Sequence, residues 1–217
     1  LVADEGATYD HHESIDLSTL EPLIATPSSP GNVVPVREVA GKKISQTVVG
    51  SSANPALRDF WIVGEIVAGK MVDEEVSLDI NPSSRQKIEA LSRMGSIAIL
   101  MQAGARYHQT GCMGCIGMGQ APATGTISLR TMPRNFPGRS GTVDDEVYLC
   151  SPETAAVSAL RGQITDPREM GEKMAYPTYP EPEEGAVNTR MLVAPPEDGK
   201  DVELKKGPNI KTLPDFP

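Results

Sequence analysis

Two cysteines, Cys112 and Cys115, lie three residues apart in a glycine-rich stretch at residues 111–119 (GCMGCIGMG). In a tight loop this spacing brings both sulfurs to one side, and the glycines let the backbone approach a bound group closely. The residues alone leave four interpretations open: a structural zinc site, a dithiol redox site, two unliganded structural cysteines, or an iron–sulfur cluster.

The rest of the sequence favours the cluster among these four, at least in a longer parent protein. A structural zinc ion needs four ligands, and Cys150 and the three histidines stand at no suitable spacing to complete the set. A dithiol redox pair normally opens a helix, and the glycines that follow Cys115 make a poor helix start.

Two arginines, Arg134 and Arg139, lie five residues apart in a loop that Pro133, Pro137 and Gly138 stiffen. A guanidinium binds a carboxylate through two parallel hydrogen bonds, so a pair of them suits a di- or tricarboxylate. From the spacing alone, surface ion pairs on an acidic protein are the simpler interpretation.

The elements that must position these side chains alternate along the chain. Apolar and β-branched residues predict strands at 43–49, 75–80, 126–131 and 146–150, and a polar–apolar alternation predicts a short one at 14–18. Helical periodicity predicts helices at 55–67, 84–94, 96–104 and 152–161. Strands that alternate with helices are typical of an α/β domain, so we expect a largely parallel sheet flanked by helices.

Ligands of such sheets collect at the carboxyl ends of the strands. The turn at residues 50–54 and the turn at Cys150 and Ser151 both follow predicted strands. Asn54 is a plausible helix N-cap, with Pro55 at the first helical position. We therefore expect the cysteine loop and the arginine loop to reach this same edge of the sheet.

The composition predicts three regions: a lead-in segment at 1–40, an α/β domain at 41–169, and an extended proline-rich linker at 170–217. Eight of the nineteen prolines lie in the last region, where no apolar periodicity is visible. Because the chain begins at Leu1 rather than methionine and ends in a polar, proline-dotted segment, we expect an excised piece of a longer protein.

The net charge is −9 and the pI is about 4.9, which argues against nucleic acid or an anionic membrane as a partner, since phosphates need a positive surface. No apolar run approaches the ~18 residues of a membrane span. Three cysteines cannot all pair, which favours the reducing cytoplasm.

Three segments together resemble the aconitase superfamily, which holds aconitases, isopropylmalate dehydratases and homoaconitases. They are residues 111–119, residues 134–139 (RNFPGR) and residues 151–153 (SPE), in the same order and spacing. Residues 48–54 (VVGSSAN) are similar to the family's strand ending in Gly-Ser-Cys-Thr-Asn. The resemblance covers nearly the whole chain, and the run at 148–168 is most similar to bacterial aconitases (aconitate hydratases).

The resemblance implies that this chain is the cluster-bearing third core domain, with the linker leading to a further C-terminal domain of the same parent chain. In the family, three thiolates hold a [4Fe–4S] cluster whose open iron acts as a Lewis acid on the substrate hydroxyl. Cys112 and Cys115 fall on two of the three ligands. Arg134 and Arg139 fall on the arginines that bind the substrate carboxylates.

Three departures from the family pattern matter. Ser52 stands where the third cluster cysteine belongs, and Cys150 is the only spare thiol. Pro133 replaces an asparagine, and the family's catalytic histidines, acidic residues and serine base lie outside this chain. Two hypotheses follow. One is a fragment, inactive alone, of a hydro-lyase acting on a hydroxy-tricarboxylate such as citrate or isocitrate; the other is a cluster-free relative that binds a carboxylate or a partner.

Overall fold

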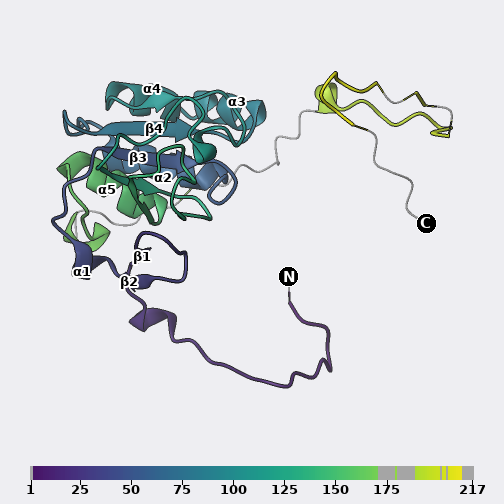
Figure 1. The fold of residues 1–217 in the computed structure, drawn as a ribbon. Coiled ribbons are helices and arrows are strands. Elements are labelled where there is room, and N and C mark those ends of the chain that lie inside the picture. Colours follow the sequence, from purple (N-terminus) through teal and green to yellow (C-terminus); the bar gives the residue numbers. More distant parts are fainter. Residues whose placement is uncertain (1, 171–178, 180–188, 201, 204, 212–217) are drawn as a thin grey trace. The chain divides into compact units, whose positions relative to one another are not determined.

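The computed structural model describes residues 2–170, 179, 189–200, 202–203 and 205–211. The chain forms two units, Leu1–Glu184 and Gly185–Pro217. The first unit contains a seven-stranded sheet with the order β2-β1-β7-β6-β3-β4-β5, of which Figure 1 labels β1 to β4. The strands are β1 (Leu23–Ala25), β2 (Val33–Pro35), β3 (Gln46–Gly50), β4 (Ser77–Asn81), β5 (Arg106–Tyr107), β6 (Ile127–Arg130) and β7 (Glu146–Leu149).

Five neighbouring strands, from β7 to β5, run parallel, whereas β1 pairs antiparallel with both β7 and β2. This confirms the predicted α/β class with a largely parallel sheet. The helices are α1 (Val36–Val39), α2 (Leu57–Val67), α3 (Arg85–Arg93), α4 (Ser96–Gln102) and α5 (Pro152–Arg161).

Local signals in the sequence set the ends of α3 and α5, whereas α2 begins at Leu57 after Ala56 and not at Pro55 after Asn54 as predicted. Ser84 caps α3 by accepting from the N–H of Lys87 at 3.3 Å, and Ser151 caps α5 in the same way. Pro152 occupies the first turn of α5, and Gly162 ends the helix with a φ of 69°. The helix predicted at 96–104 is confirmed as α4.

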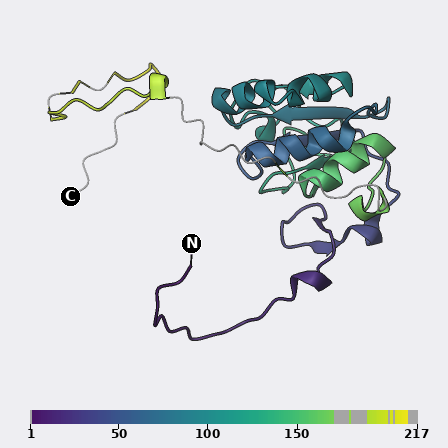
Figure 2. The same cartoon turned by 180° about the vertical axis from the view of Figure 1, so that it is seen from behind.

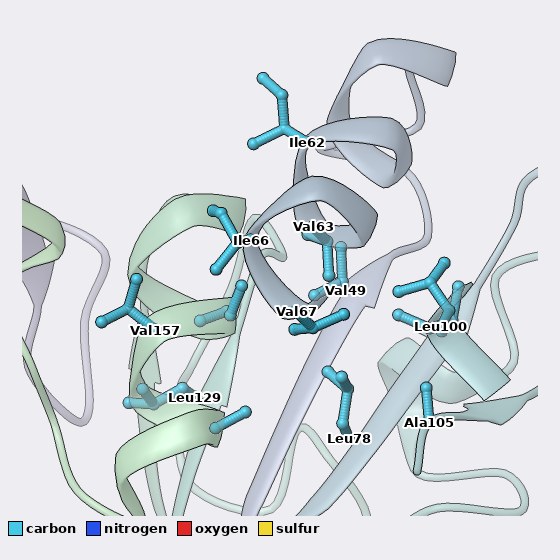
Figure 3. Close-up of a cluster of buried hydrophobic side chains, with 14 of the residues drawn as sticks. Val49, Ile62, Val63, Ile66, Val67, Leu78, Leu100, Ala105, Leu129 and Val157 are labelled. Atoms are coloured by element: carbon cyan, nitrogen blue, oxygen red, sulfur yellow. The ribbon is translucent and has the colours of Figure 1, made fainter. Parts of the chain in front are cut away.

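The hydrophobic core lies between one face of the sheet and the helices. Figure 2 shows α2 and α5 side by side over the strands, and α2 also packs against α4. Figure 3 shows Val63 and Val67 of α2 close to Val49 and Leu78 of the sheet, and Ile66 on the side of α2 that faces α5. Each fully buried aliphatic side chain of this kind contributes about 1.5–3 kcal/mol, so this face holds the domain together.

The opposite face of the sheet is buried and largely polar, apart from a small hydrophobic cluster of Val48, Cys115 and Met132. It carries alternate residues of β3, β4 and β6, namely Gln46, Asp79, Asn81, Ser128 and Arg130. The cysteine loop lies on this face, since its backbone bonds to both Asn81 and Arg130. The fold thus separates an apolar, helix-covered face from a polar face that carries the candidate site.

The strand predicted at residues 14–18 was wrong, and three short strands were not predicted. Residues 14–18 do not form a strand, because Asp16 caps a single 3-10 turn at Leu17–Thr19 by accepting from the Ser18 N–H at 2.9 Å. The lead-in region at 1–40 supplies β1 and β2, three-residue strands between prolines that no periodicity signals. The two-residue β5 also lacked a signal.

The proposed division into 1–40, 41–169 and 170–217 stays a prediction. Much of the proline-rich tail falls outside the described residues, which in the second unit include one 3-10 turn at Thr189–Met191. Within the described parts of the chain, the helices are too short or too polar to cross a membrane.

Candidate functional site

The candidate site lies at the carboxyl ends of β3 and β4, where a sharp turn follows Gly50. At Gly50 the φ is 115°, and a Cβ would lie 2.3 Å from the carbonyl oxygen of Asn81 and 2.8 Å from the Phe60 ring. Only glycine fits this position without moving backbone. Ser51 follows with a φ of 69° and donates its N–H to the same Asn81 carbonyl at 2.9 Å. The turn thereby presents Ser51 and Ser52 at the edge of the sheet.

The cysteine loop is fixed to this edge through Asn81. The Asn81 Oδ1 accepts from the Gly114 N–H at 3.2 Å, and its Nδ2 donates to the Gln109 carbonyl at 3.1 Å. On the far side of the loop, a Cβ at Gly117 would lie 2.1 Å from the Ser140 carbonyl oxygen. The cysteine loop therefore packs tightly against both the sheet and the arginine loop.

The two cysteines differ in exposure and environment. Cys112 is exposed, and its Sγ lies 3.3 Å from Ser51 Oγ, whereas Cys115 is 2% exposed. The hydrogen bond with Ser51 is the largest cause that holds the pKa of Cys112 below its usual value. Hydrogen bonds with Cys115 and Ser52 and the charge of Arg139 act in the same direction. These five side chains therefore form one cluster.

The arginine loop reaches the cluster through one of its two arginines. Arg139 donates from Nη1 to the Cys115 carbonyl at 3.0 Å and from Nη2 to Cys115 Sγ at 2.8 Å. Arg134 is exposed and forms no hydrogen bond or ion pair with the residues that the structure describes. The structure thus brings Cys112, Cys115, Ser52 and Arg139 together and leaves Arg134 at the surface of the same loop.

Cys150 does not join this cluster. Its half-buried side chain packs against the main hydrophobic core, on the helix-covered side. Burial, and secondarily the negative charge of Glu153, raises the pKa of the Cys150 thiol well above its usual value. Across the described residues, no three His, Cys, Asp or Glu side chains gather into a metal-binding group. Cys150 therefore lies apart from the two thiols of the cysteine loop, and the side chains beside Cys112 include those of Ser51 and Ser52.

Sequence reasoning missed a buried polar network beneath the cysteine loop. Arg130 is 0% exposed, and burial lowers the pKa of its guanidinium to about 10, against the opposing effect of Asp145 and Asp79. Asp79, also fully buried, accepts from His108 Nε2 at 3.0 Å and from Arg106 Nε at 3.3 Å. The sequence carries a charged residue in two of the predicted strands, Asp79 at 75–80 and Arg130 at 126–131, but this pattern alone does not indicate burial.

Comparison with known proteins gives consistent matches. The model of the aconitase family (aconitate hydratase) matches residues 1–162. The 3-isopropylmalate dehydratase large subunit 1 of Methanopyrus kandleri is 42% identical over 167 residues, which cover 76% of this chain and 40% of that protein. The homoaconitase large subunit of Thermus thermophilus is 38% identical over 178 residues, 81% of this chain and 42% of that protein. The chain thus spans about two fifths of the length of these relatives.

Proposed function

This chain belongs to the aconitase family, and we propose that it is part of the large subunit of a hydro-lyase of the isopropylmalate dehydratase and homoaconitase type. Such an enzyme removes water from a hydroxy acid and adds it back at the neighbouring carbon. The observation that carries the proposal is the contact of Arg139 with Cys115, beside Cys112, at the carboxyl edge of a parallel sheet.

We propose Cys112 and Cys115 as two ligands of an iron–sulfur cluster, which supplies a Lewis-acidic iron to the substrate hydroxyl when bound. Two thiols on one loop, with a guanidinium on one sulfur, suit an anionic iron–sulfur group. The third donor would be the hydroxyl of Ser52, which joins Cys112 in the cluster of side chains. The residues present therefore fit a centre with two thiolates and a hydroxyl, and a hydroxyl is a weaker iron ligand than a thiolate.

The two arginines would bind the carboxylates of the substrate. Arg139 is anchored at Cys115, so its guanidinium is held where one carboxylate would lie next to the metal site. Arg134 lies five residues earlier in the same loop, and its guanidinium is exposed to a second carboxylate. Together they orient a di- or tricarboxylate, while the proton acceptor comes from outside this chain.

The substrate and partner follow from the relatives. Those reported above are named isopropylmalate dehydratase and homoaconitase large subunits, which favours 3-isopropylmalate or a homologous hydroxy acid. Citrate and isocitrate, the substrates of an aconitate hydratase, are the alternative, and the names of these two relatives support them less. The name "large subunit" also points to a small subunit as partner, which would take the place of the C-terminal domain expected in the same chain.

Anaerobic reconstitution tests the proposed function. The polypeptide that carries this chain is incubated with ferrous iron and sulfide, alone and with its small subunit, and the cluster is followed by EPR after reduction. Turnover of 3-isopropylmalate, homocitrate and citrate is followed by the ultraviolet absorbance of the enoate. A cluster signal with turnover of one of these acids is expected; no cluster and no turnover would refute the proposal.

A cluster-free carboxylate-binding relative is the second candidate, because the described residues offer two thiols at the site and no third. Ser52→Cys separates the two candidates. A large rise in cluster yield shows that the native site has lost most of its affinity for the cluster. An unchanged yield beside a working native cluster shows that serine is accepted as the third donor. Carboxylate binding measured by calorimetry without any cluster in either protein would favour the second candidate.

A further inference from the structure

The guanidinium of Arg130 is fully buried on the polar face of the sheet and has an acceptor for each of its five N–H groups. Its partners are Ser128 Oγ at 3.0 Å, the Gly114 carbonyl at 2.9 Å, Gln46 Oε1 at 2.8 Å, the Gln120 carbonyl at 2.9 Å and Met132 Sδ at 3.9 Å. These partners come from three segments: β6 and the residues beside it, β3, and the cysteine loop.

None of these partners is a carboxylate. A buried charge without an ion pair is costly, and buried arginines are normally paired. Among the residues that the structure describes, no acidic side chain lies within ion-pair distance of Arg130, and Asp79 and Asp145 act on it only through space. A methionine of similar volume would avoid this cost but would leave the oxygen acceptors of Arg130 without their donor, so the purpose of the guanidinium is to hold these acceptors.

That purpose is visible in where the hydrogen bonds lead. Two of the acceptors are backbone carbonyls of the cysteine loop, at Gly114 and Gln120, which lie on either side of Cys115 in the chain. Two others, Ser128 and Gln46, belong to the sheet. A planar guanidinium can bridge these directions at fixed angles, whereas the three donors of a lysine cannot.

Gln46 extends the bridge across the sheet to Asp79. Its Nε2 donates to Asp79 Oδ2 at 3.3 Å, while its Oε1 accepts from Arg130 and from Ser128 Oγ at 2.7 Å. Asp79 is held in turn by Ser77 Oγ at 3.1 Å. These sheet residues therefore hold one side of the guanidinium, and its other side bonds to the cysteine loop.

We propose that Arg130 is a positioning residue that holds Cys115 at the candidate metal site by fixing the two flanks of the cysteine loop to the sheet. Arg139 holds the same cysteine from the other side, through its carbonyl and its sulfur. The importance of this role for catalysis rests on the proposed function, but the positioning itself is a property of the chain without metal.

Differential alkylation of the reduced, chelator-treated chain tests the proposal. Iodoacetamide labelling of Cys112 and Cys115 is timed by peptide mass spectrometry in the wild type and in Arg130→Met. We expect the buried Cys115 to react far more slowly than Cys112, and Arg130→Met to reduce this protection by about tenfold or more, because each hydrogen bond to a charged donor corresponds to roughly one factor of ten.

Leu129→Ala is the matched control, because Leu129 lies in the same strand but faces the helices. It lowers the melting temperature and leaves the ratio of the two labelling rates within about twofold, since its side chain packs on the opposite face of the sheet from the cysteine loop. An unchanged ratio in Arg130→Met, or an equal loss of protection in Leu129→Ala, overturns the proposal. If Arg130→Met does not fold, Arg130→Lys decides: an intermediate ratio supports the proposal, and the wild-type ratio overturns it.

Cluster reconstitution separates this proposal from the proposed function. A wild-type protein that forms no cluster, with a labelling ratio that still depends on Arg130, removes the proposed function and keeps the positioning role. If the wild-type protein forms a cluster but its labelling ratio is independent of Arg130, the proposed function is kept and the positioning role is removed.

Discussion

Ser51 Oγ lies 3.3 Å from Cys112 Sγ, across 61 residues of sequence. The contact joins the turn after β3 to the cysteine loop, so the exposed thiol is held by the same turn that carries Ser52. The hydroxyl also stabilises the thiolate, since it is the largest cause that lowers the pKa of Cys112. Both effects depend on one side chain and can be tested together.

Replacing Ser51 with glycine removes the hydroxyl and tolerates the φ of 69° at this position. In the metal-free chain the pKa of Cys112 then rises toward its usual value, so the pH at which alkylation of Cys112 is half-maximal rises as well. Labelling at neutral pH becomes slower, because the thiolate is the nucleophile. Pulse alkylation across a pH series measures this shift.

Cys150 and Ser52 supply the controls for this experiment. Burial raises the pKa of Cys150, so this thiol should remain the least reactive of the three in every variant. Ser52→Gly should shift Cys112 less than Ser51→Gly, since the Ser52 hydrogen bond is the smaller cause. If Ser51→Gly does not change the pH dependence of Cys112 alkylation, the proposed role of the hydroxyl is contradicted.

The two arginines of the loop should respond differently to replacement by glutamine. In the enzyme that carries its cluster, each variant should weaken substrate binding by about tenfold or more, because a hydrogen bond to a charged group contributes about 1.5–3 kcal/mol. Only Arg139→Gln should also increase the labelling of Cys115 in the metal-free chain, since of the two arginines it is Arg139 that contacts that sulfur. KM values and labelling rates check the two effects separately, and equal labelling in both variants would contradict the geometry.

The sequence predicted most of the helical framework because its boundaries are chemically marked. The structure places Ser84 at the N-cap of α3, Ser151 at the N-cap of α5 and Gly162 at the C-cap of α5, as predicted. The strands β1 and β2 carry no such mark. Each has three residues, and Pro35 ends the second, so neither was long enough to show a period.

The candidate site was predicted in part, from residue spacing and a family resemblance and not from capping residues. The spacing of Cys112 and Cys115 left four kinds of site open. The order of strands placed their loop and the arginine loop at one edge of the sheet, and resemblance to a family assigned Arg139 to the substrate. The buried Arg130 could not be predicted, because a charged residue in a strand is normally assigned to a solvent-exposed face. Here the cysteine loop covers that face, and only the fold shows this.

Asp166 should stabilise the domain only while it is ionised. It accepts from the Arg168 N–H at 2.9 Å and from Arg168 Nη2 at 2.6 Å, and the side-chain bond is the main reason why its pKa lies below 3.8. A lowered pKa contributes stability that is complete above the unfolded-state value and is lost as the pH falls through the folded-state value. Asp166→Asn should therefore cost about 1 kcal/mol at neutral pH, since Arg168 is half exposed.

The cost of Asp166→Asn should shrink toward zero as the pH falls below 3.8. Urea unfolding at a series of pH values measures the difference in free energy. Glu89→Gln is a suitable control, since its pair with Arg93 lies on an exposed helix surface and should change stability little. A gap between wild type and Asp166→Asn that is independent of pH would show that packing, not charge, explains the variant.

Gly50→Ala should be among the most damaging single substitutions in the chain. The new Cβ would meet the Asn81 carbonyl oxygen at 2.3 Å and the Phe60 ring at 2.8 Å, with a φ of 115°. Backbone strain and overpacking of 1–3 kcal/mol each give a loss of about 2–6 kcal/mol. Gly69→Ala separates the two causes, because its φ is 68° and nothing lies within 4 Å. Chemical denaturation should show a loss of only about 1 kcal/mol there, and equal losses at both positions would refute the close approach of β3 to β4 on which the site is built.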